Sequence, residues 1–433
     1  TTKHTTVQST EHIMASHSML KPINGLMVGT GEYTTGVVAN TQSKSDKKLG
    51  VVALCLFDLR RRGLIAELSM SGRSGEKYPV VREHFAKNIA SEYKDMDVEF
   101  RSYPADDEVD SKAYLKALDD LEPGSIVTVF TPDDTHFEIA LAAVERGMHV
   151  LVTKPAVKSL AHHQRLMDEA KKRNLLVMVE VHKRFDVMYA DACIRIRSEL
   201  GAFSFFQSYM SQPKFQLQTF SAWAGSKTSD ISYYLNSHHI DFHVWALQQK
   251  AVPLQVTAMA STGVAKREPY NADTEDTITL LVQWQDVATG DLGTATYTSS
   301  WIAPPSDVHS QQRFFYMGQK GSITIDQAHR GYMLATDQKG LVSMNPLYMK
   351  YTKDVRGHFA GQQGYGYQSI EAFVRAAQEM NAGLCTLEEC DNELATIAST
   401  VFVTAILEAG RLSLDEKRTV QLVHAQDGSV SLQ

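Results

Sequence analysis

Residues 127–158, VTVFTPDDTHFEIALAAVERGMHVLVTKPAVK, decide the fold of the first half of the chain. They and the preceding isoleucine divide into a buried strand at 126–130, a turn at 131–134, an amphipathic helix at 135–146 and a second buried strand at 149–152. Two short apolar runs around a helix-period segment predict a right-handed βαβ unit and a parallel sheet. Ligands bind beyond the carboxyl ends of such strands, where Thr131 and Lys154 are expected. Lys154, fixed by the following proline, is a candidate for chemistry because partial desolvation tunes an ammonium group.

The flanking sequence extends this pattern to a dinucleotide-binding domain. Strands are expected at 25–28, 50–57, 98–103 and 176–181, and helices at 35–42, 80–89, 110–121 and 161–174. Residues 60–88 are longer and more polar than a simple crossover requires, which predicts a loop insertion before the helix at 80–89. With the central unit, the count is six parallel strands by about residue 181, which is typical of an α/β Rossmann domain.

The pattern changes to period-2 alternation in the second half. Strands are expected at 203–210, 254–261, 277–284, 293–301, 313–317 and 322–325, and helices at 186–200, 232–248, 369–380 and 388–410. This predicts an α+β domain with a large open antiparallel sheet. The expected organisation is a flexible arm at 1–21, a Rossmann domain at 22–182 and a substrate or oligomerisation domain at 183–433, with the late helices free to pack back on the first domain.

Composition excludes several classes of protein. A net charge of -7 over 433 residues argues against nucleic acid as a partner. No window approaches the roughly 20 apolar residues of a membrane span. Four cysteines without paired spacing indicate reduced thiols and, with the absence of an apolar signal core, a cytoplasmic location. The open sheet predicts a homodimer, unless a loop covers it.

The turn after the first strand, GTGEYTTG at 29–36, is the expected cofactor site. Its glycines allow a tight turn and the approach of a pyrophosphate to a helix N-terminus, so Gly29, Gly31, Glu32 and Tyr33 are candidate contacts. The spacing departs from GxGxxG, since Thr34 stands in the third glycine's place.

The end of the expected second strand should select the cofactor. There Asp58 could bind the adenosine ribose of NAD(H), while Arg60 could bind the 2′-phosphate of NADP(H). An equally good interpretation for the arginines is a solvated basic turn.

The helix expected at 232–248 carries a second group of polar side chains. Tyr234, His238 and Asp241 share one face, and a phenol, an imidazole and a carboxylate together form a proton-transfer set. His239 and His243 form another i, i+4 pair, with Asn236 nearby. A zinc site is disfavoured because no third ligand stands at a suitable spacing. The junction His182-Lys183-Arg184-Phe185 adds cations, for binding or for pairing between the domains.

Taken together, these motifs resemble the glucose–fructose oxidoreductase, inositol dehydrogenase and rhizopine catabolism family of NAD(P)-dependent dehydrogenases. The resemblance covers about residues 25–300 and rests on VGTGEYTTG, TPDDTHFEIALAAVERGMHVLVTKP, VHKRF and SHHID. Within the family, PKFQLQTFSAWAG followed by SDISYYLNSHHIDFHVWA is similar to the D-galacturonate reductases.

The resemblance implies roles for single residues. Lys154 matches the lysine that contacts substrate and nicotinamide, and His238 matches the catalytic histidine. Thr131, Pro132 and His136 match the loop that lines the cofactor. Thr153 stands where the family usually has glutamate, which leaves open how the nicotinamide ribose is held.

Two further departures from the family pattern bear on cofactor and mechanism. The family's strand-two aspartate aligns with Leu56, which favours NADP(H), with NAD(H) as an alternative. Tyr234 replaces the aspartate four residues before the catalytic histidine, so Tyr234, His238 and Lys154 compete for the acid role.

The expected activity is NAD(P)H-dependent reduction of the C1 aldehyde of D-galacturonate to L-galactonate. The candidate groups for the substrate's contacts are Lys183, Arg184, Lys214, Asn236 and His239. The alternatives are a dehydrogenase of a neutral sugar, inositol or dihydrodiol, which needs no carboxylate clamp, and a non-catalytic dinucleotide sensor, which needs neither Lys154 nor His238.

Overall fold

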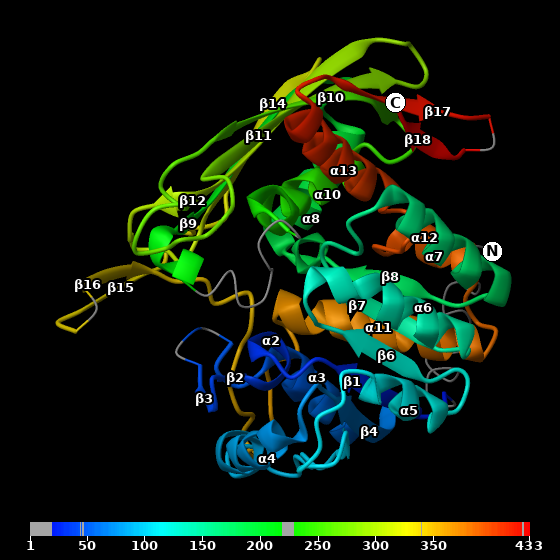
Figure 1. Cartoon of the computed structure of the whole chain (residues 1–433), viewed down its shortest axis with the longest axis vertical. Coiled ribbons are helices and arrows are strands. Elements are labelled where there is room, and N and C mark those ends of the chain that lie inside the picture. Colours follow the sequence, from blue (N-terminus) through cyan, green and yellow to red (C-terminus); the bar gives the residue numbers. More distant parts are fainter. Residues whose placement is uncertain (1–19, 44, 46, 219–228, 339, 427) are drawn as a thin grey trace, which may run out of the picture.

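Two β-sheets, one parallel and one mixed, organise the chain in the computed structural model (Figure 1). The structure describes residues 20–433 apart from 44, 46, 219–228, 339 and 427. The sequence expected at 1–21 to be a flexible arm therefore lies almost wholly outside the described residues. Among the described helices none is both long enough and apolar enough to cross a bilayer.

The first sheet contains six parallel strands in the order β5-β4-β1-β6-β7-β8. Their bounds are β1 Ile23–Val28, β4 Ile65–Ser71, β5 Arg101–Tyr103, β6 Ile126–Val129, β7 His149–Thr153 and β8 Val177–Glu180. Helix α6 (His136–Glu145) joins β6 to β7, which confirms the predicted βαβ unit. The count of six strands is confirmed as well.

Helices cover both faces of this sheet, so its central strands are buried throughout. Alternate residues of a strand point to opposite faces. Val127 and Val129 accordingly pack against α5 (Ala113–Asp119), α6 and α7 (Leu160–Arg173). Ile126 packs on the other side, with α3 (Val51–Arg61), α4 (Tyr78–Phe85) and α11 (Tyr365–Asn381). A late helix thus completes the core of the first domain.

The strand predicted at 50–57 is wrong, because this segment is helix α3. Residues 51–59 of α3 are all buried, since the helix packs against β4 of the sheet and against α11, which lies beside it on the same face. A helix that is buried all round loses the polar face that would reveal its period, so a short apolar run of this kind reads equally well as a strand. The true second strand is β4, inside the stretch predicted to be a loop insertion.

The helix predicted at 35–42 is also wrong. After the glycine turn the chain forms only the short helix α2 (Glu32–Thr35) and then a small hairpin of β2 (Val37–Val38) and β3 (Thr41–Gln42). The segment between α2 and Gly50, called the excursion below, begins and ends at the same place. A Cβ on Gly50 would lie 2.4 Å from the carbonyl oxygen of Thr34. Gly50 has a φ of 79°, which favours glycine. The excursion therefore interrupts the crossover between β1 and β4.

The second sheet has eight strands in the order β14-β13-β9-β12-β11-β10-β17-β18. Their bounds are β9 Phe203–Pro213, β10 Ala251–Ser261, β11 Thr277–Asp286, β12 Leu292–Ala303, β13 Gln311–Gly318, β14 Gly321–Asp326, β17 Val420–His424 and β18 Val430–Leu432. All six predicted strands are present. The sheet is mixed rather than purely antiparallel, because β12 pairs with β9 in parallel.

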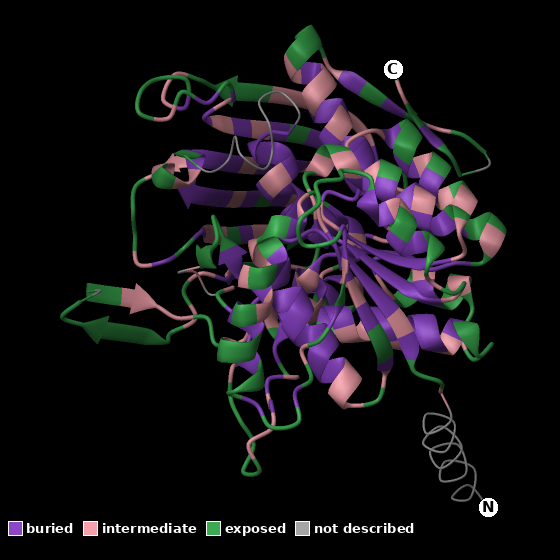
Figure 2. Ribbon diagram, turned by 60° about the horizontal axis from the view of Figure 1, so that its bottom comes forward, coloured by how far each residue is buried: buried purple, intermediate pink, exposed green. Residues whose placement is uncertain are grey.

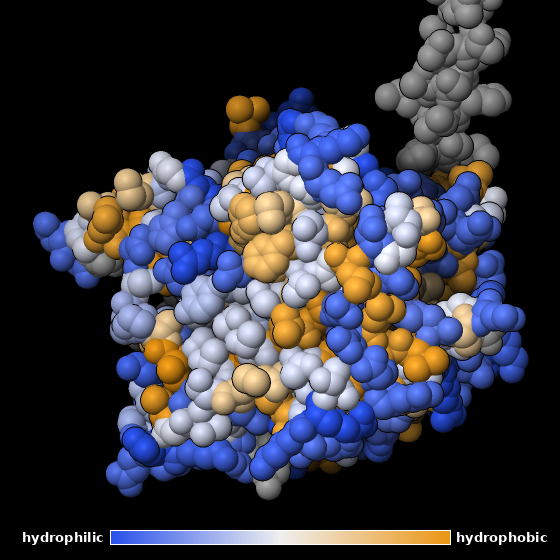
Figure 3. Space-filling view, turned by 90° about the horizontal axis from the view of Figure 1, so that it is seen from above, coloured by the Kyte–Doolittle hydropathy of each residue, from blue (hydrophilic) through white to orange (hydrophobic). Residues whose placement is uncertain are grey.

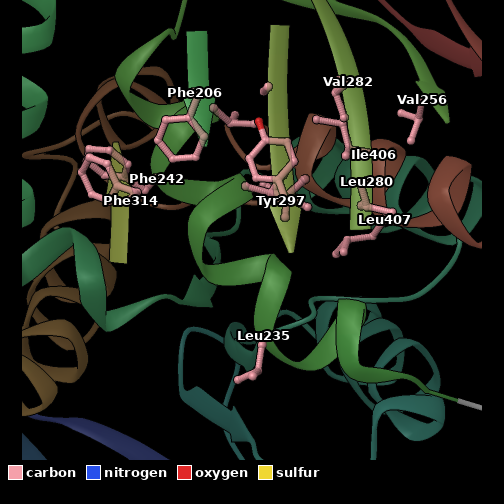
Figure 4. Close-up of a cluster of buried hydrophobic side chains, with 14 of the residues drawn as sticks. Phe206, Leu235, Phe242, Val256, Leu280, Val282, Tyr297, Phe314, Ile406 and Leu407 are labelled. Atoms are coloured by element: carbon pink, nitrogen blue, oxygen red, sulfur yellow. The ribbon is translucent and has the colours of Figure 1, made fainter. Parts of the chain in front are cut away.

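Three helices cover the inner face of the second sheet: α8 (Val187–Ser198), α10 (Ser237–Ala246) and α13 (Val401–Glu416). Figure 4 shows their shared core, in which Phe242 of α10 and Leu407 of α13 approach Phe206 and Leu280 of the strands. The single helix predicted at 388–410 is wrong. It is two helices, α12 (Leu387–Glu393) and α13, between which Ala395 and Ile397 bond to the backbone of β8.

Two parts of the surface carry exposed apolar side chains: the hairpin of β15 (Met333–Thr336) and β16 (Gly340–Ser343), and the outer side of the second sheet. The hairpin is largely exposed, whereas the middle of both sheets is buried (Figure 2). On the outer side of the second sheet, apolar side chains lie between weakly polar ones (Figure 3). Met259, Leu281 and Met317 are exposed there. The homodimer through this sheet stays a prediction.

Candidate active site

The carboxyl edge of the first sheet faces η6, a π-helical turn at Ser232–Asn236, and helix α10, which follows it directly. The Lys154 ammonium, just after β7, donates a hydrogen bond to the carbonyl oxygen of Tyr234 and lies 4.0 Å from the centre of the Tyr234 ring. These residues are 80 positions apart in the chain. The two motifs that the sequence singled out therefore meet across the domains, and π turns are frequent at functional sites.

Lys154 is desolvated in this position. Burial lowers the pKa of Lys154 to about 8, although the carboxylates of Asp133 and Glu180 act in the opposite direction. A lysine with such a pKa exchanges its proton close to neutral pH, as an acid or base in catalysis must.

The loop that carries Lys154 is fixed by His136. One ring nitrogen of His136 lies 2.9 Å from the carbonyl oxygen of Pro155, and the other lies 2.8 Å from that of Thr131. The ring is fully buried between these two loops. His136 thus joins the loops after β6 and β7, while Thr131, Pro132 and Thr153 remain partly or fully exposed at the sheet edge.

The glycine turn after β1 fits a dinucleotide. Gly29 has a φ of 111°, and a Cβ there would meet the carbonyl oxygen of Phe130 at 2.1 Å. A Cβ on Gly31 would meet nothing within 4 Å, and no side chain caps the helix that starts there. The turn thus leaves open space at uncapped amides, where a pyrophosphate can bind.

Two other residues of the turn have protein partners. Glu32 accepts hydrogen bonds from the hydroxyls of Ser43 and Ser45, which anchors the excursion to the turn. Tyr33 stacks on Phe130 at 5.2 Å, and its hydroxyl lies 2.7 Å from that of Tyr348. Their side chains therefore shape this edge of the site.

The expectations that Asp58 contacts the adenosine ribose and that Arg60 contacts a 2′-phosphate are wrong, because both residues lie on α3 rather than at the end of a strand. Asp58 is fully buried and accepts hydrogen bonds from Arg61, Tyr367 and Gln362. Arg60 donates to the carbonyl oxygen of Glu99 at 2.9 Å and pairs with Asp97. The arginine triplet marks a helix end, where cations suit the dipole.

The second strand of the sheet, β4, ends at Ser71 and leads into Gly72-Arg73-Ser74. Gly72 packs against Thr30 of the glycine turn, since a Cβ on it would lie 2.7 Å from the Thr30 methyl group. Arg73 is exposed at this position. No acidic side chain stands at the strand end, where an NAD(H) site would place one. The signal missed in the sequence was Arg62-Gly63, which closes a helix instead of opening a crossover.

His238 and Tyr234 flank Lys154 from the second domain. His238 is 8% exposed, and among the described residues its Nδ1 has no hydrogen-bond partner. Burial, and then the charges of Lys154 and Lys183, hold the pKa of His238 well below its usual range. Burial raises the pKa of Tyr234, whose ring stacks on Trp301 and whose hydroxyl accepts from Gln212 at 3.3 Å.

Two predicted substrate contacts are instead structural. Arg184 and Asp241 form a buried ion pair of 2.7 Å, which takes both out of any substrate site. His239 is fully buried in the core of the second domain, where its Nε2 lies 2.9 Å from the Tyr189 hydroxyl. Asn236 is buried as well and donates to Ser232 at 3.0 Å.

The remaining cations differ in their surroundings. Lys183 is buried, donates to the amide oxygens of Gln312 and Gln327, and has its pKa lowered by burial to about 7. Lys214 is half-buried at the end of β9. Lys47, which the sequence did not single out, lies on the excursion after α2. Its charge lowers the pKa of Tyr234 and of Lys154, although burial has the larger effect on both.

No group of three or more potential metal-binding side chains occurs within the described part of the chain.

Comparisons with known proteins agree with this arrangement. Residues 71–181 match the family model described as an oxidoreductase family with an NAD-binding Rossmann fold. An uncharacterized oxidoreductase of Schizosaccharomyces pombe is 30% identical over 42% of this chain and 49% of its own length, so the chain spans about half of that relative. The NADP(+)-dependent scyllo-inositol 2-dehydrogenase IolW of Bacillus subtilis is 26% identical over 69% of this chain and 79% of its own length.

The fold itself recurs among solved structures. The structure of GenD2 from gentamicin A biosynthesis, in complex with NAD, covers 94% of this chain and 98% of its own with a TM-score of 0.64. Sequence identity to it is 18%, so this likeness shows the fold alone. With the six-stranded parallel sheet and the open glycine turn, the match over residues 71–181 shows an NAD-binding Rossmann domain similar to that of this oxidoreductase family.

Proposed function

We propose that this chain is an NADPH-dependent reductase that converts the C1 aldehyde of a hexuronate to an alcohol, with D-galacturonate to L-galactonate as the first candidate reaction. The observation that carries the reductase assignment is the contact of Lys154 with Tyr234, beside His238, across the two domains. When bound, the nicotinamide supplies the hydride.

Lys154 is the best placed acid among the three candidates. As hydride reaches a carbonyl carbon, negative charge develops on the oxygen, and a fixed cation in a site shielded from water stabilises that charge. Its pKa of about 8 leaves the ammonium protonated at neutral pH and able to release its proton. His238, with a depressed pKa, is neutral there and Tyr234, with a raised pKa, holds its proton too tightly. Both then orient the substrate.

The cations around Lys154 favour an acidic sugar. The charges of Lys47 and Lys183 act on Lys154 and on its neighbours Tyr234 and His238. The carboxylates of Glu180 and Asp133 also act on Lys154, and each accepts a hydrogen bond from a serine, Ser369 and Ser229 respectively. A substrate carboxylate bound close to these lysines would gain charge-assisted contacts that a neutral sugar lacks.

A substrate panel tests the proposal. We expect kcat/KM for D-galacturonate to exceed that for D-galactose by about 10-fold or more, as one charge-assisted contact implies. Lys47→Gln should reduce this preference, whereas Lys48→Gln, at the exposed neighbouring lysine, should not. Consumption of NADPH with each sugar gives the rates.

The second candidate function is oxidation of a cyclic polyol, which the likeness to a scyllo-inositol 2-dehydrogenase favours. Equal rates on galacturonate and galactose, or faster turnover of scyllo-inositol with NADP⁺ than of any uronate, would refute the hexuronate assignment in favour of this one. Cofactor binding without turnover of any of these compounds would indicate a sensor.

Cofactor choice gives another prediction. Arg73 stands exposed at the end of β4 with no acidic side chain at the strand end, so it is available to the 2′-phosphate of NADPH. Arg73→Ala is expected to weaken NADPH binding by about 10- to 100-fold, the value of hydrogen bonds to a charged group, and to leave NADH binding unchanged. Fluorescence titration of both cofactors measures this directly. Lys77→Ala, at an exposed lysine of the same loop region, serves as the control, and an equal loss for both cofactors would contradict the assignment.

A further inference from the structure

A carboxylate–imidazole pair lies beside His238 on the first domain. Glu180, the last residue of β8, is 2% exposed, and its side chain lies 3.3 Å from Nδ1 of His182. Ser369 of α11 donates to Oε1 of the same carboxylate at 2.9 Å. His182 opens the short turn η4 (His182–Phe185). Strand β8, which carries Glu180, and helix α11, which carries Ser369, therefore together hold the Glu180 carboxylate against the His182 imidazole.

The ring of His182 is also held in place by aromatic contacts. It stacks on Tyr365 with 5.5 Å between ring centres and lies 5.2 Å from the ring of Tyr348. On its remaining side, its centre is 5.6 Å from that of His238. At this separation one water molecule between the rings can carry a proton from one to the other.

Within the described part of the chain, no carboxylate pairs with His238. The residue one helical turn before it is Tyr234, and the residue three positions after it, Asp241, is engaged by Arg184. Its Nδ1 is buried and unpartnered among the described residues. A buried nitrogen without a partner costs free energy unless a ligand or water serves it. Such an atom is a site at which a proton can be passed on.

A reductase that donates a proton from Lys154 must recover one in each turnover. The side chain of His182 is 17% exposed, so it reaches solvent while also touching the ring of His238. We propose that His182, oriented by Glu180, is a further residue of the site, which takes a proton from solvent and passes it through His238 toward Lys154. This inference rests on the proposed reductase function.

The proton balance of this path is closed. The substrate carbon gains the hydride and the substrate oxygen gains the proton of Lys154. His238 accepts a proton at one ring nitrogen and releases one from the other, so its own charge is unchanged at the end. The Glu180 side chain holds the imidazole in one orientation, the role that a carboxylate commonly has beside a catalytic histidine.

The charged and titratable groups around His182 come from several elements. They are Glu180, Lys154, Lys183, His238, Tyr348 and Tyr365. Changes at any of them can alter the pH profile. The test therefore changes His182 and Glu180 separately and compares both with a histidine outside the site.

The first measurement needs no turnover. In nitrogen-15 histidine spectra of the ligand-free protein, Glu180→Gln should change the tautomer populations of His182, because an amide can donate as well as accept, whereas a carboxylate only accepts. An unchanged His182 signal would overturn the proposal. This outcome is independent of any substrate.

The second measurement is kinetic. His182→Asn is expected to lower kcat by about 100-fold, within the usual range for one proton-transfer group, with little change in KM. Added imidazole should restore part of the rate, which a purely structural role would not allow. The control, His162→Gln, changes an exposed ring stacked on Phe137 of α6 and should leave kcat unchanged.

The possible failures are distinguishable. A kcat for His182→Asn within about twofold of wild type, or a loss that imidazole does not restore, would overturn the role of His182, since about 100-fold is expected for a proton-transfer group. Absence of turnover by the wild-type protein with every sugar would refute the reductase function, and the spectra would still decide whether Glu180 orients His182.

Discussion

Replacing Lys154 by methionine is expected to lower kcat for hexuronate reduction by about 100-fold or more, the usual effect of removing one preorganised charge. Methionine retains much of the length of the side chain but has no ammonium to donate to the Tyr234 carbonyl or to a substrate oxygen. The binding constant for NADPH should change little, because the glycine turn and Arg73 are untouched. Steady-state rates and fluorescence titration together separate chemistry from binding.

The dependence of the wild-type rate on pH is a second test of the role of Lys154. Burial lowers the pKa of Lys154 to about 8. The protonated form is the acid needed for reduction, so the rate should fall as pH rises through about 8, and this limb should be absent from Lys154→Met. Lys172→Met, at an exposed lysine of α7, is the matched control. Near-normal turnover of Lys154→Met would remove the lysine from the mechanism.

The central βαβ unit was predictable from sequence because its signals agree. The strands β6 and β7 are short apolar runs buried on both faces, and α6 between them has helical periodicity. The second sheet was predictable for a different reason. Its outer face is exposed, so β11 alternates between buried and less buried residues, as in Ile278 and Thr279. Local pattern and tertiary environment coincide in both places.

Helix α3 was not predictable by the same means, and the error spread to the cofactor site. Helix α11, about 300 residues later in the chain, packs against α3. As a result α3 has no exposed polar face before Arg60. Taking it for a strand moved the expected ribose contact to Asp58, which in fact bonds to Tyr367 of α11. The strand that is present, β4, ends at Ser71, so Arg73 becomes the candidate for the contact with the 2′-phosphate. Long-range burial, which no local window contains, decided this point.

The parts of the candidate site could be predicted, but their partners could not. Lys154 and His238 stood out by motif, and pairing between the domains was one interpretation of Arg184, but the sequence did not identify Asp241 as its partner or Glu180 as the partner of His182. His239 was predicted as a substrate contact next to the catalytic candidate His238. The two are adjacent on α10, but the ring of His238 lies in the site and that of His239 lies in the core. Only the packing of α10 distinguishes them.

Removing the carboxylate of Asp241 is expected to give the largest loss of stability. Asp241→Ala leaves the Arg184 guanidinium buried, with the carbonyl oxygen of Leu394 as its one remaining hydrogen-bond acceptor among the described residues. Breaking a buried ion pair from one side costs about 3 to 5 kcal/mol. For a protein of 433 residues, we expect the midpoint of thermal unfolding to fall by about 3 to 6 °C.

The matched control is Asp191→Ala on α8. Asp191 pairs with Arg195 in the same way, but both side chains are about half exposed, so the loss should be below about 1 kcal/mol. Equal losses in the two variants would show that the buried pair is not structural. The pair also connects η4, which carries His182, to α10, which carries His238. Asp241→Ala should therefore lower kcat even at temperatures where the protein remains folded, because it loosens the contact between the two rings.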